Sequence, residues 1–358
     1  MSAQSASPAL LRAVAVSGDA AAVEGPLHGY HHETYVFPLP GVTGPAGQVR
    51  WKCREPRPDL LWFDRRCFAS EEQLLRSLEG RIDGIPELIE AGSTRLQRFV
   101  EGHTLGRSYG SGTEVPEQLV SQVINLFRQL AAVRPGSLTA ERTCDPADRA
   151  AEGDSSGFLE RLLLFTEKRV YRQNLPRFAG LFGDLGLDDG SFKKLRRRVS
   201  GLTERPFCLL HADLHRENFV VDPENRLWTI DWELAMFGDP LYDLATHVYL
   251  MRYPADQERH VVRRWREAVD AVAPGSSAGY ADDLPKLLAY KRAQSVFTDV
   301  IRTALTLDPG PVTDREPLDR AGRRIEKVLI AAEVTLEIDR MPGTADIALA
   351  LEKWCRNA

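Results

Sequence analysis

The chain has 358 residues, of which 43% are hydrophobic and 27% charged, and its formal net charge is -5. This balance is typical of a folded globular protein, and the length is enough to bury a core without crosslinks. The net charge and the lack of a long basic tract argue against a nucleic-acid partner. The densest basic run, residues 193–198, is interpreted as a solvated helix face. No segment approaches the roughly 20 apolar residues of a membrane span, so no membrane partner is expected.

The cysteines indicate a reducing compartment. They are five in number and scattered, at Cys53, Cys67, Cys144, Cys208 and Cys355, with no Cys-x-x-Cys pair. An odd, scattered set argues against a disulfide framework and against a zinc site. The first 20 residues lack the charged front and continuous apolar core of a signal peptide. We therefore expect a cytoplasmic protein, and the sequence carries no indication of its oligomeric state.

The first third of the chain is predicted to be rich in strands. Four strand candidates cover residues 34–37, 48–53, 86–90 and 96–100. The Pro/Gly-rich stretch between the first two predicts an antiparallel hairpin. A helix is predicted over residues 70–78, with Ser70 as its N-cap.

After residue 102 the pattern becomes largely helical. Amphipathic helices are predicted over residues 115–133, 158–173, 256–272, 281–305, 314–340 and 344–356. Short strands are expected at residues 209–210, 219–221 and 227–230. The sequence thus predicts an α+β protein with a small β-rich lobe (1–102) and a larger helical lobe (103–358), with a ligand site between them.

One polar cluster within the second lobe has the composition of a phosphoryl-transfer site. Asp213 is followed by Asn218, and Asp231 comes at the end of a later strand. Phosphoryl transfer needs a carboxylate that orients the attacking hydroxyl, and oxygen ligands for magnesium. A turn at residues 222–225 predicts a hairpin that brings Asn218 and Asp231 to the same end.

This region resembles the aminoglycoside phosphotransferase family, which has a bilobal protein-kinase-like fold. Residues 211–218 (HADLHREN) match its His-x-Asp-x-x-x-x-Asn loop, and residues 230–233 (IDWE) match its metal motif. Residues 238–245 (GDPLYDLA) match its Gly-Asp-Pro-x-x-Asp-Leu-Ala signature. Three ordered motifs at this spacing are far more specific than any one of them.

The resemblance implies a role for each matching residue. Asp213 would be the catalytic base, and Asn218 and Asp231 would be the magnesium ligands. His211 is expected to be a structural hydrogen-bonding residue. Asp243 is expected to cap the following helix and brace the loop. For Glu233, contact with substrate or metal and a supporting role remain equally open.

A nucleotide site in the first lobe would need a strand lysine and a helix glutamate that holds it. Lys52 fits, although Arg50 and Arg54 lie on the same strand face and are rivals. Glu71 shares the inward stripe of its helix, whereas Glu72 is rotated outward. The alternative for both acids is a solvated helix N-terminus.

Two further segments complete the expected nucleotide site. Residues 26–34 lie where a phosphate-covering hairpin belongs, with Gly29 and His31 as candidate contacts, but this segment has one glycine rather than several. Residues 97–102 resemble the hinge between the lobes, where the backbone of Arg98, Phe99 and Val100 would pair with the nucleobase. ATP is expected, with GTP left open.

The acceptor is expected to be a hydroxylated small molecule. Residues 251–358 contain 17 Asp/Glu and 17 Lys/Arg, a net charge of zero. A polycationic aminoglycoside would favour an acidic surplus there. The sequence therefore predicts a kinase of a less cationic antibiotic or natural product, which would confer resistance by O-phosphorylation. The alternatives are a kinase of a choline-, homoserine- or sugar-like metabolite, and a catalytically silent nucleotide-binding protein.

Overall fold

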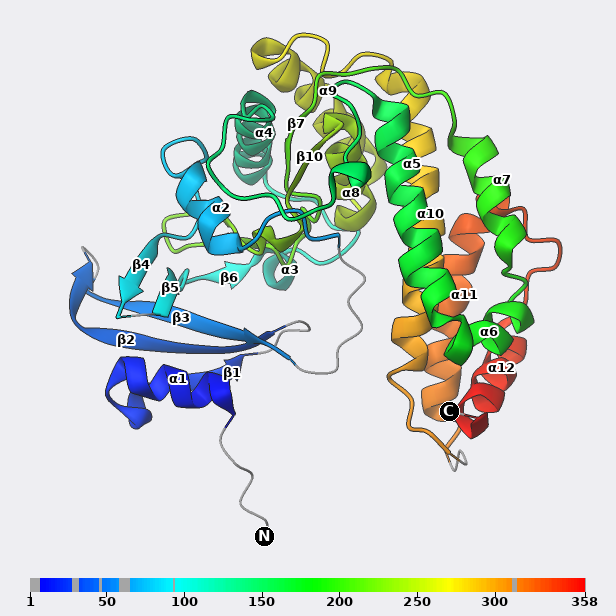
Figure 1. Ribbon diagram of the computed structural model, residues 1–358, viewed down its shortest axis with the longest axis horizontal. Coiled ribbons are helices and arrows are strands. Elements are labelled where there is room, and N and C mark those ends of the chain that lie inside the picture. Colours follow the sequence, from blue (N-terminus) through cyan, green and yellow to red (C-terminus); the bar gives the residue numbers. More distant parts are fainter. Residues whose placement is uncertain are drawn as a thin grey trace. The chain divides into compact units, whose positions relative to one another are not determined.

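The computed structural model describes residues 7–27, 32–44, 47–57, 65–92, 94–310 and 314–357 (Figure 1). The chain divides into two compact units, each made of three stretches of sequence. Unit 1 comprises Met1–Thr143, Asp213–Met236 and Leu250–Ala268, and unit 2 comprises Cys144–Ala212, Phe237–Tyr249 and Val269–Ala358. The lobe boundary at residues 102–103 stays a prediction.

Unit 1 contains a five-stranded antiparallel sheet in the order β1-β2-β3-β5-β4. Its strands are β1 (Glu24–Leu27), β2 (His32–Gly44), β3 (Gly47–Pro56), β4 (Leu88–Ala91) and β5 (Thr94–Arg98). The predicted hairpin is confirmed, because β2 and β3 pair antiparallel with Val36 opposite Lys52. Both strands are longer than predicted, and β5 ends two residues before the predicted end at Val100.

The two faces of this sheet have different neighbours. One face packs on helix α1 (Pro8–Ser17), with a core made of Ala9, Ala13, Tyr35, Phe37, Leu39, Trp51, Cys53 and Leu96. Side chains alternate across a strand, so Lys52 and Arg54 point to the opposite face. Helix α2 (Glu71–Leu78) lies on that side (Figure 1). Its predicted cap is confirmed, because the Ser70 hydroxyl accepts a hydrogen bond from the Gln73 amide at 3.0 Å.

The rest of unit 1 consists of helices and a small sheet. The strands β6 (His103–Thr104), β8 (Phe219–Val221) and β9 (Leu227–Thr229) form an antiparallel sheet in the order β6-β8-β9. The predicted hairpin around residues 222–225 is confirmed, with Phe219 opposite Thr229. The helical elements are α3 (Leu105–Ser108), α4 (Glu117–Ala132), most of α9 (Ala255–Val272), η1 (Ala20–Ala22) and η5 (Trp232–Leu234).

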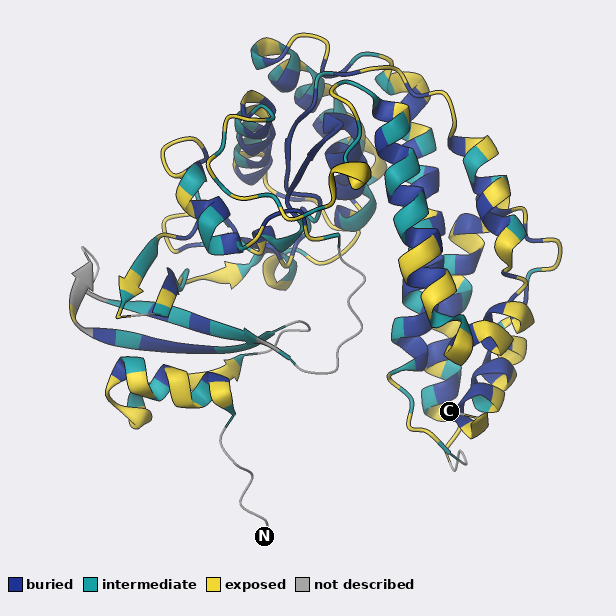
Figure 2. Ribbon diagram, viewed as in Figure 1, coloured by how far each residue is buried: buried dark blue, intermediate teal, exposed yellow. Residues whose placement is uncertain are grey.

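Unit 2 is mainly helical. Its helices are α5 (Ser155–Phe165), α6 (Leu175–Asp184), α7 (Asp189–Val199), most of α8 (Pro240–Met251), α10 (Tyr280–Ala304), α11 (Glu316–Leu336) and α12 (Thr344–Asn357). Shorter turns are η2 (Pro146–Asp148), η3 (Thr166–Tyr171) and η4 (Arg172–Asn174). The strands β7 (Cys208–Leu210) and β10 (Met236–Gly238) form a two-stranded sheet whose residues are all buried (Figure 2). The long helices predicted for the second half are confirmed to within a few residues, apart from the C-terminal end of α11.

Aromatic side chains fill the core of unit 2. The rings of Tyr171, Phe182, Phe192 and Phe297 contact one another, and the Phe192 and Phe297 rings stack with centroids 4.5 Å apart. Such contacts make these rings core residues rather than a ligand surface. None of the described helices is both long enough and apolar enough to cross a membrane.

Candidate functional site

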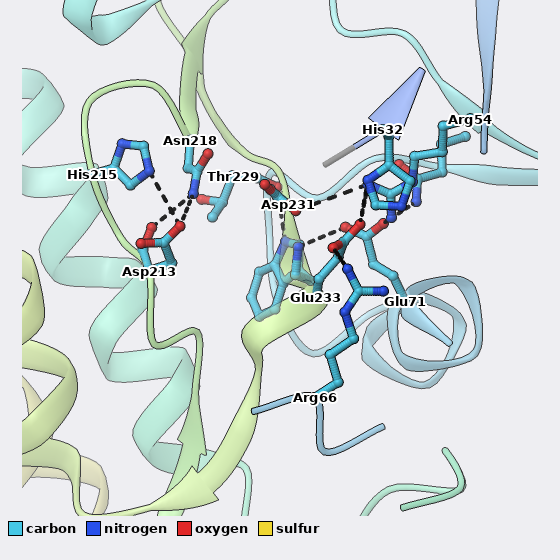
Figure 3. Close-up of polar contacts among 12 residues, drawn as sticks. His32, Arg54, Arg66, Glu71, Asp213, His215, Asn218, Thr229, Asp231 and Glu233 are labelled. Carbon is cyan, nitrogen blue, oxygen red and sulfur yellow. Dashed lines mark hydrogen bonds and ion pairs between the residues drawn. The ribbon is translucent and has the colours of Figure 1, made fainter. Parts of the chain in front are cut away.

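The predicted catalytic carboxylate, Asp213, is held by two neighbours from its own loop. The side-chain nitrogen Nδ2 of Asn218 donates to the Asp213 carbonyl at 2.9 Å and to Asp213 Oδ2 at 3.1 Å. His215 Nε2 lies 3.3 Å from the same carboxylate oxygen (Figure 3). The Asp213 side chain is 29% exposed, so it is oriented by these bonds and still within reach of solvent.

His215 is a site residue that the sequence analysis did not single out. Its Nδ1 accepts a hydrogen bond from the Glu217 amide at 3.2 Å, so the proton of the neutral ring lies on Nε2, facing Asp213. Burial alone lowers the pKa of His215, but the hydrogen bond and charge of Asp213 outweigh it, and the pKa lies above its ordinary value. A second histidine only two residues after Asp213 is the signal that could have identified it.

The predicted metal ligands, Asn218 and Asp231, lie at the same end of the β8–β9 hairpin. The Ile230 amide donates to the Asn218 carbonyl at 3.0 Å, which places Asp231 one residue beyond this pair. Asp231 adopts the left-handed backbone conformation (φ 64°, ψ 65°), which is unfavourable for a residue with a side chain. Its side chain is 49% exposed. The hairpin therefore presents a carboxylate to solvent at the price of local strain.

These two residues fit a magnesium ion that also takes oxygens from a substrate. The amide nitrogen of Asn218 is used on Asp213, so the amide oxygen is the atom that could act as a ligand. No group of three or more His, Cys, Asp or Glu in the described part of the chain could hold a metal by itself. Magnesium is commonly held by one or two protein oxygens together with phosphates and water, so two ligands are sufficient.

Glu71 joins helix α2 to the segment that carries Asp231. Its Oε1 accepts a hydrogen bond from the Trp232 amide at 2.7 Å. Its Oε2 accepts from the side-chain nitrogen Nε2 of Gln97 at 2.6 Å and forms an ion pair with Arg54. The carboxylate is buried, as the inward stripe of the helix predicted. Glu71 thus fixes the backbone immediately after Asp231 relative to the sheet.

The cation that holds Glu71 is Arg54, not Lys52. Among the described residues no ion pair joins Lys52 to Glu71, whereas Arg54 contacts both Glu71 and Glu233. The third rival, Arg50, binds acids elsewhere on the surface of the sheet. The strand face was predicted correctly, but which of its three cations reaches α2 depends on their distance along β3.

Glu233 is surrounded by positive charge. Its carboxylate lies 3.0 Å from Arg54 and 3.1 Å from His32, and it also forms an ion pair with Arg66 (Figure 3). Its side chain is only 7% exposed, whereas that of Asp231 two residues earlier is about half exposed. Of the two alternatives left open for Glu233, this environment favours a supporting role.

The motif matches can now be compared with known proteins. The model of the Phosphotransferase enzyme family matches residues 50–287, which is 238 of the 358 residues. The chain belongs to this family. The family resemblance inferred from its motifs is thereby confirmed, and the chain is a small-molecule phosphotransferase.

Solved phosphotransferase structures share the fold. The macrolide 2'-phosphotransferase MphH from Brachybacterium faecium is similar with a TM-score of 0.51 and 18% identity, over 91% of this chain and 97% of that one. The choline kinase LicA from Streptococcus pneumoniae has a TM-score of 0.51 and 16% identity, over 87% and 92%. No curated protein sequence matches the chain. At such identities the likeness shows the fold, and it confirms the predicted kinase-like α+β class.

Lys52 of this phosphotransferase has an unusual environment. It lies opposite Gln97 in the β3–β5 pairing and lines a cavity of about 440 Å³ together with Arg54, Glu72 and Gln97. Burial, aided by the nearby charge of Arg54, lowers the pKa of Lys52 to about 8. A partly desolvated ammonium of this kind has a strong preference for an anionic partner.

Two further residues of the phosphotransferase motifs, His211 and Asp243, lie in unit 2. The Asp243 carboxylate accepts hydrogen bonds from the amides of His211 and Ala212, at 3.1 and 2.7 Å. Asp243 therefore holds the backbone that leads into the loop. It does not cap helix α8, because it lies inside the first turn. The Leu241 amide is instead bound by Asp239, which precedes the helix.

The predicted hinge and covering loop are only partly described. The Arg98 amide donates to Glu87 and the Phe99 amide to the Arg50 carbonyl, at 2.8 and 2.9 Å. Both amides are thus used within unit 1, and the hinge role of Arg98, Phe99 and Val100 stays a prediction. The candidate contacts Gly29 and His31 lie outside the described residues.

Proposed function

We propose that this phosphotransferase is an ATP- and magnesium-dependent kinase that transfers a phosphoryl group to a hydroxyl of an antibiotic or related natural product. The observation that carries the proposal is the placement of Asp213 beside Asn218, with Asp231 at the same end of the hairpin. A part-exposed, hydrogen-bonded carboxylate next to two magnesium-binding oxygens has the composition that phosphoryl transfer requires.

Each residue would have a defined task. Asp213 would accept the proton of the acceptor hydroxyl as that oxygen attacks the γ-phosphorus, and His215 would keep its carboxylate oriented. Asn218 Oδ1 and the Asp231 carboxylate would hold magnesium, which when bound neutralises negative charge on the phosphates. Lys52 would bind phosphate oxygens, since its partly desolvated ammonium favours a negative partner.

The charge of the late helices supports an acceptor that is not strongly cationic. Residues 251–358 are electrically neutral overall, with 17 acidic and 17 basic side chains. The aromatic side chains that could have stacked on a ligand there are mostly core: Tyr253, Trp265, Tyr290 and Phe297 are buried. Recognition of the acceptor would then depend on shape and neutral polar contacts more than on charge.

The test is a transfer assay against a defined panel. The purified chain, with ATP and magnesium, is incubated with macrolide, aminoglycoside, nucleoside and peptide antibiotics, and with choline and homoserine. ADP release and the mass of the phosphorylated acceptor are both measured. We expect transfer to an uncharged or weakly charged antibiotic, abolished by chelation of magnesium, with Asp213→Asn as the matched inactive control.

Three outcomes would contradict the proposal in different ways. Transfer to choline or homoserine alone would make the protein a kinase of a primary metabolite. Tight nucleotide binding without transfer to any acceptor would support the silent alternative. Equal transfer by the Asp213→Asn variant would remove Asp213 from the mechanism while leaving the activity intact.

A further inference from the structure

Arg216 is a buried arginine whose hydrogen-bond partners are backbone carbonyl groups. It follows Asp213 by three residues and is only 5% exposed. Its Nε donates to the Met251 carbonyl at 2.9 Å, Nη1 to Tyr109 at 2.7 Å and Nη2 to Thr113 at 3.0 Å. No carboxylate in the described chain forms an ion pair with it.

This arrangement is costly for the folded protein. A guanidinium removed from water without a counter-charge is destabilising, and burial lowers the pKa of Arg216 from its ordinary value. The ring of Tyr253, whose centroid is 5.8 Å from the guanidinium carbon, offsets part of the cost. An apolar side chain would avoid the burial of a charge, but it would leave the three carbonyls without these donors. The guanidinium is therefore best explained by the geometry that its three directed bonds impose.

The three carbonyls belong to two segments that are far from Arg216 in the sequence. Tyr109 and Thr113 lie between α3 and α4, and Met251 is the last residue of α8. The backbone of Arg216 adds a fourth connection, because its carbonyl accepts from the Gly106 amide at 3.1 Å. One residue thus holds its own loop to both segments.

The same two segments are also bound to each other. The Gly112 amide donates to the Arg252 carbonyl at 3.0 Å. The Val115 backbone amide donates to Gln257 Oε1 on α9 at 2.9 Å, and Gln257 Nε2 donates to the Val115 carbonyl at 2.7 Å. The segment from Tyr109 to Val115 is therefore hydrogen-bonded to the start of α9. Arg216 binds the loop of residues 213–218 to this pair of segments.

The loop of residues 213–218 also connects Arg216 to Asp213. His215, which precedes Arg216, binds the Asp213 carboxylate, and its carbonyl accepts from the Asn218 amide at 3.0 Å. We propose that Arg216 is a positioning residue that holds Asp213 in register with the Tyr109–Val115 segment and the start of α9. The inference rests on the proposed function, because that function assigns the catalytic role to Asp213.

Kinetics of three variants test this role. Arg216→Ala removes the three bonds, Arg216→Lys keeps the charge without the fork of donors, and Arg226→Met is a matched control at an exposed arginine of the adjoining hairpin. We expect kcat to fall by up to roughly 10²-fold in Arg216→Ala, because a displacement of about 1 Å can have that effect. The nucleotide KM should stay unchanged. Added methylguanidinium, but not methylammonium, should restore part of the kcat of Arg216→Ala.

Hydrogen exchange provides a second measurement that does not need activity. Amides of residues 213–218 and 109–113 should exchange faster in Arg216→Ala and Arg216→Lys than in the wild-type protein and Arg226→Met, while α2 is unaffected. Unchanged exchange in both loops, or an unchanged kcat of the folded fraction, would overturn the inference. If Arg216→Ala does not fold, Arg216→Lys decides by the same criteria. A wild-type protein without transfer activity would refute the proposed function separately, and exchange alone would then decide whether Arg216 fastens the loop.

Discussion

Two arginines of this protein each bridge a pair of carboxylates, yet their surroundings differ. In unit 2, Arg205 binds Asp239 at 2.6 Å and also Asp283, and all three side chains are at most 1% exposed. In unit 1, Arg54 binds Glu71 and Glu233, but its Nη1 also lies 4.0 Å from Asp231, whose side chain is about half exposed. The first cluster is closed, and the second is open on one side.

The charged groups of the Arg205 cluster bind further partners within unit 2. Arg205 Nε donates to the Ala278 carbonyl at 2.7 Å, and Asp283 also accepts from the Thr203 amide and from Lys286. The Arg54 cluster instead borders Lys52, whose charge has no acidic partner within ion-pair distance among the described residues. Removing one partner of a closed, buried ion pair leaves a desolvated charge and lowers stability, whereas perturbed and part-exposed groups cluster at functional sites. This difference predicts that mutations in the two clusters separate stability from turnover.

The largest effect on turnover is expected at Asp213, which belongs to neither cluster. Asp213→Ala should lower kcat by about 10²–10⁴-fold, because it removes the proposed proton acceptor. The free energy of unfolding should change little, since the Asp213 side chain is part-exposed and its partners lie in the same loop. Steady-state kinetics and urea denaturation measure the two quantities. A kcat equal to that of the wild type would reject the base.

The largest effect on stability is expected at Arg205. Arg205→Met leaves the buried Asp239 carboxylate without a counter-charge and Asp283 with Lys286 alone, which should lower the free energy of unfolding by about 3–5 kcal/mol. Adding Asp239→Asn should recover part of this loss, because one uncompensated charge disappears. Urea denaturation of the single and double variants measures the effect. If Arg205→Met is as stable as wild type, the closed cluster does not maintain the fold.

The same contrast shows what the sequence could and could not predict. The spacing of Asp213 and Asn218, and the turn at residues 222–225, are local, so the hairpin and its polar end were predicted correctly. The partner of Glu71 was not, because Arg50, Lys52 and Arg54 share one strand face at a period of two. Which cation reaches α2 depends on how the helix lies on the sheet, and no local pattern encodes that placement.

Other omissions have the same physical origin. Arg66 is 167 residues from Glu233 in the sequence, so their ion pair arises only from the tertiary fold. Helix α1 is short, and its buried positions Ala9, Ala13 and Ser17 are small, so its periodic signal is weak although Ser7 and Gly18 cap it. Small residues suit close packing against the sheet, but they contribute little to an apolar pattern.

An intermediate effect is expected where the open cluster contacts α2. Arg54→Met should lower kcat/KM for the nucleotide by roughly tenfold to a hundredfold, the loss expected from one or two hydrogen bonds to charged groups. Arg76→Met is the matched control, because Arg76 lies on the same helix and makes an exposed pair with Glu90. Kinetics with varied nucleotide measure the effect. A wild-type kcat/KM in Arg54→Met would show that the ion pair between Arg54 and Glu71 is not needed for use of the nucleotide.

The smallest effect is a dependence on pH carried by Lys52. Its pKa is about 8 in the folded protein and 10.5 without burial, so the ammonium loses its proton as pH rises past about 8. The nucleotide KM should then increase above pH 8, whereas kcat at saturating nucleotide should change less, because bound phosphate stabilises the charged form.

Stability should respond in the opposite direction. Between about pH 8 and 10.5 the unfolded chain retains the lysine proton that the folded chain has released, so this group makes the free energy of unfolding rise with pH. Lys52→Met should remove both trends, and urea denaturation and KM measured from pH 7 to 10 would show it. If the nucleotide KM rises equally in Lys52→Met, the titrating group is not Lys52.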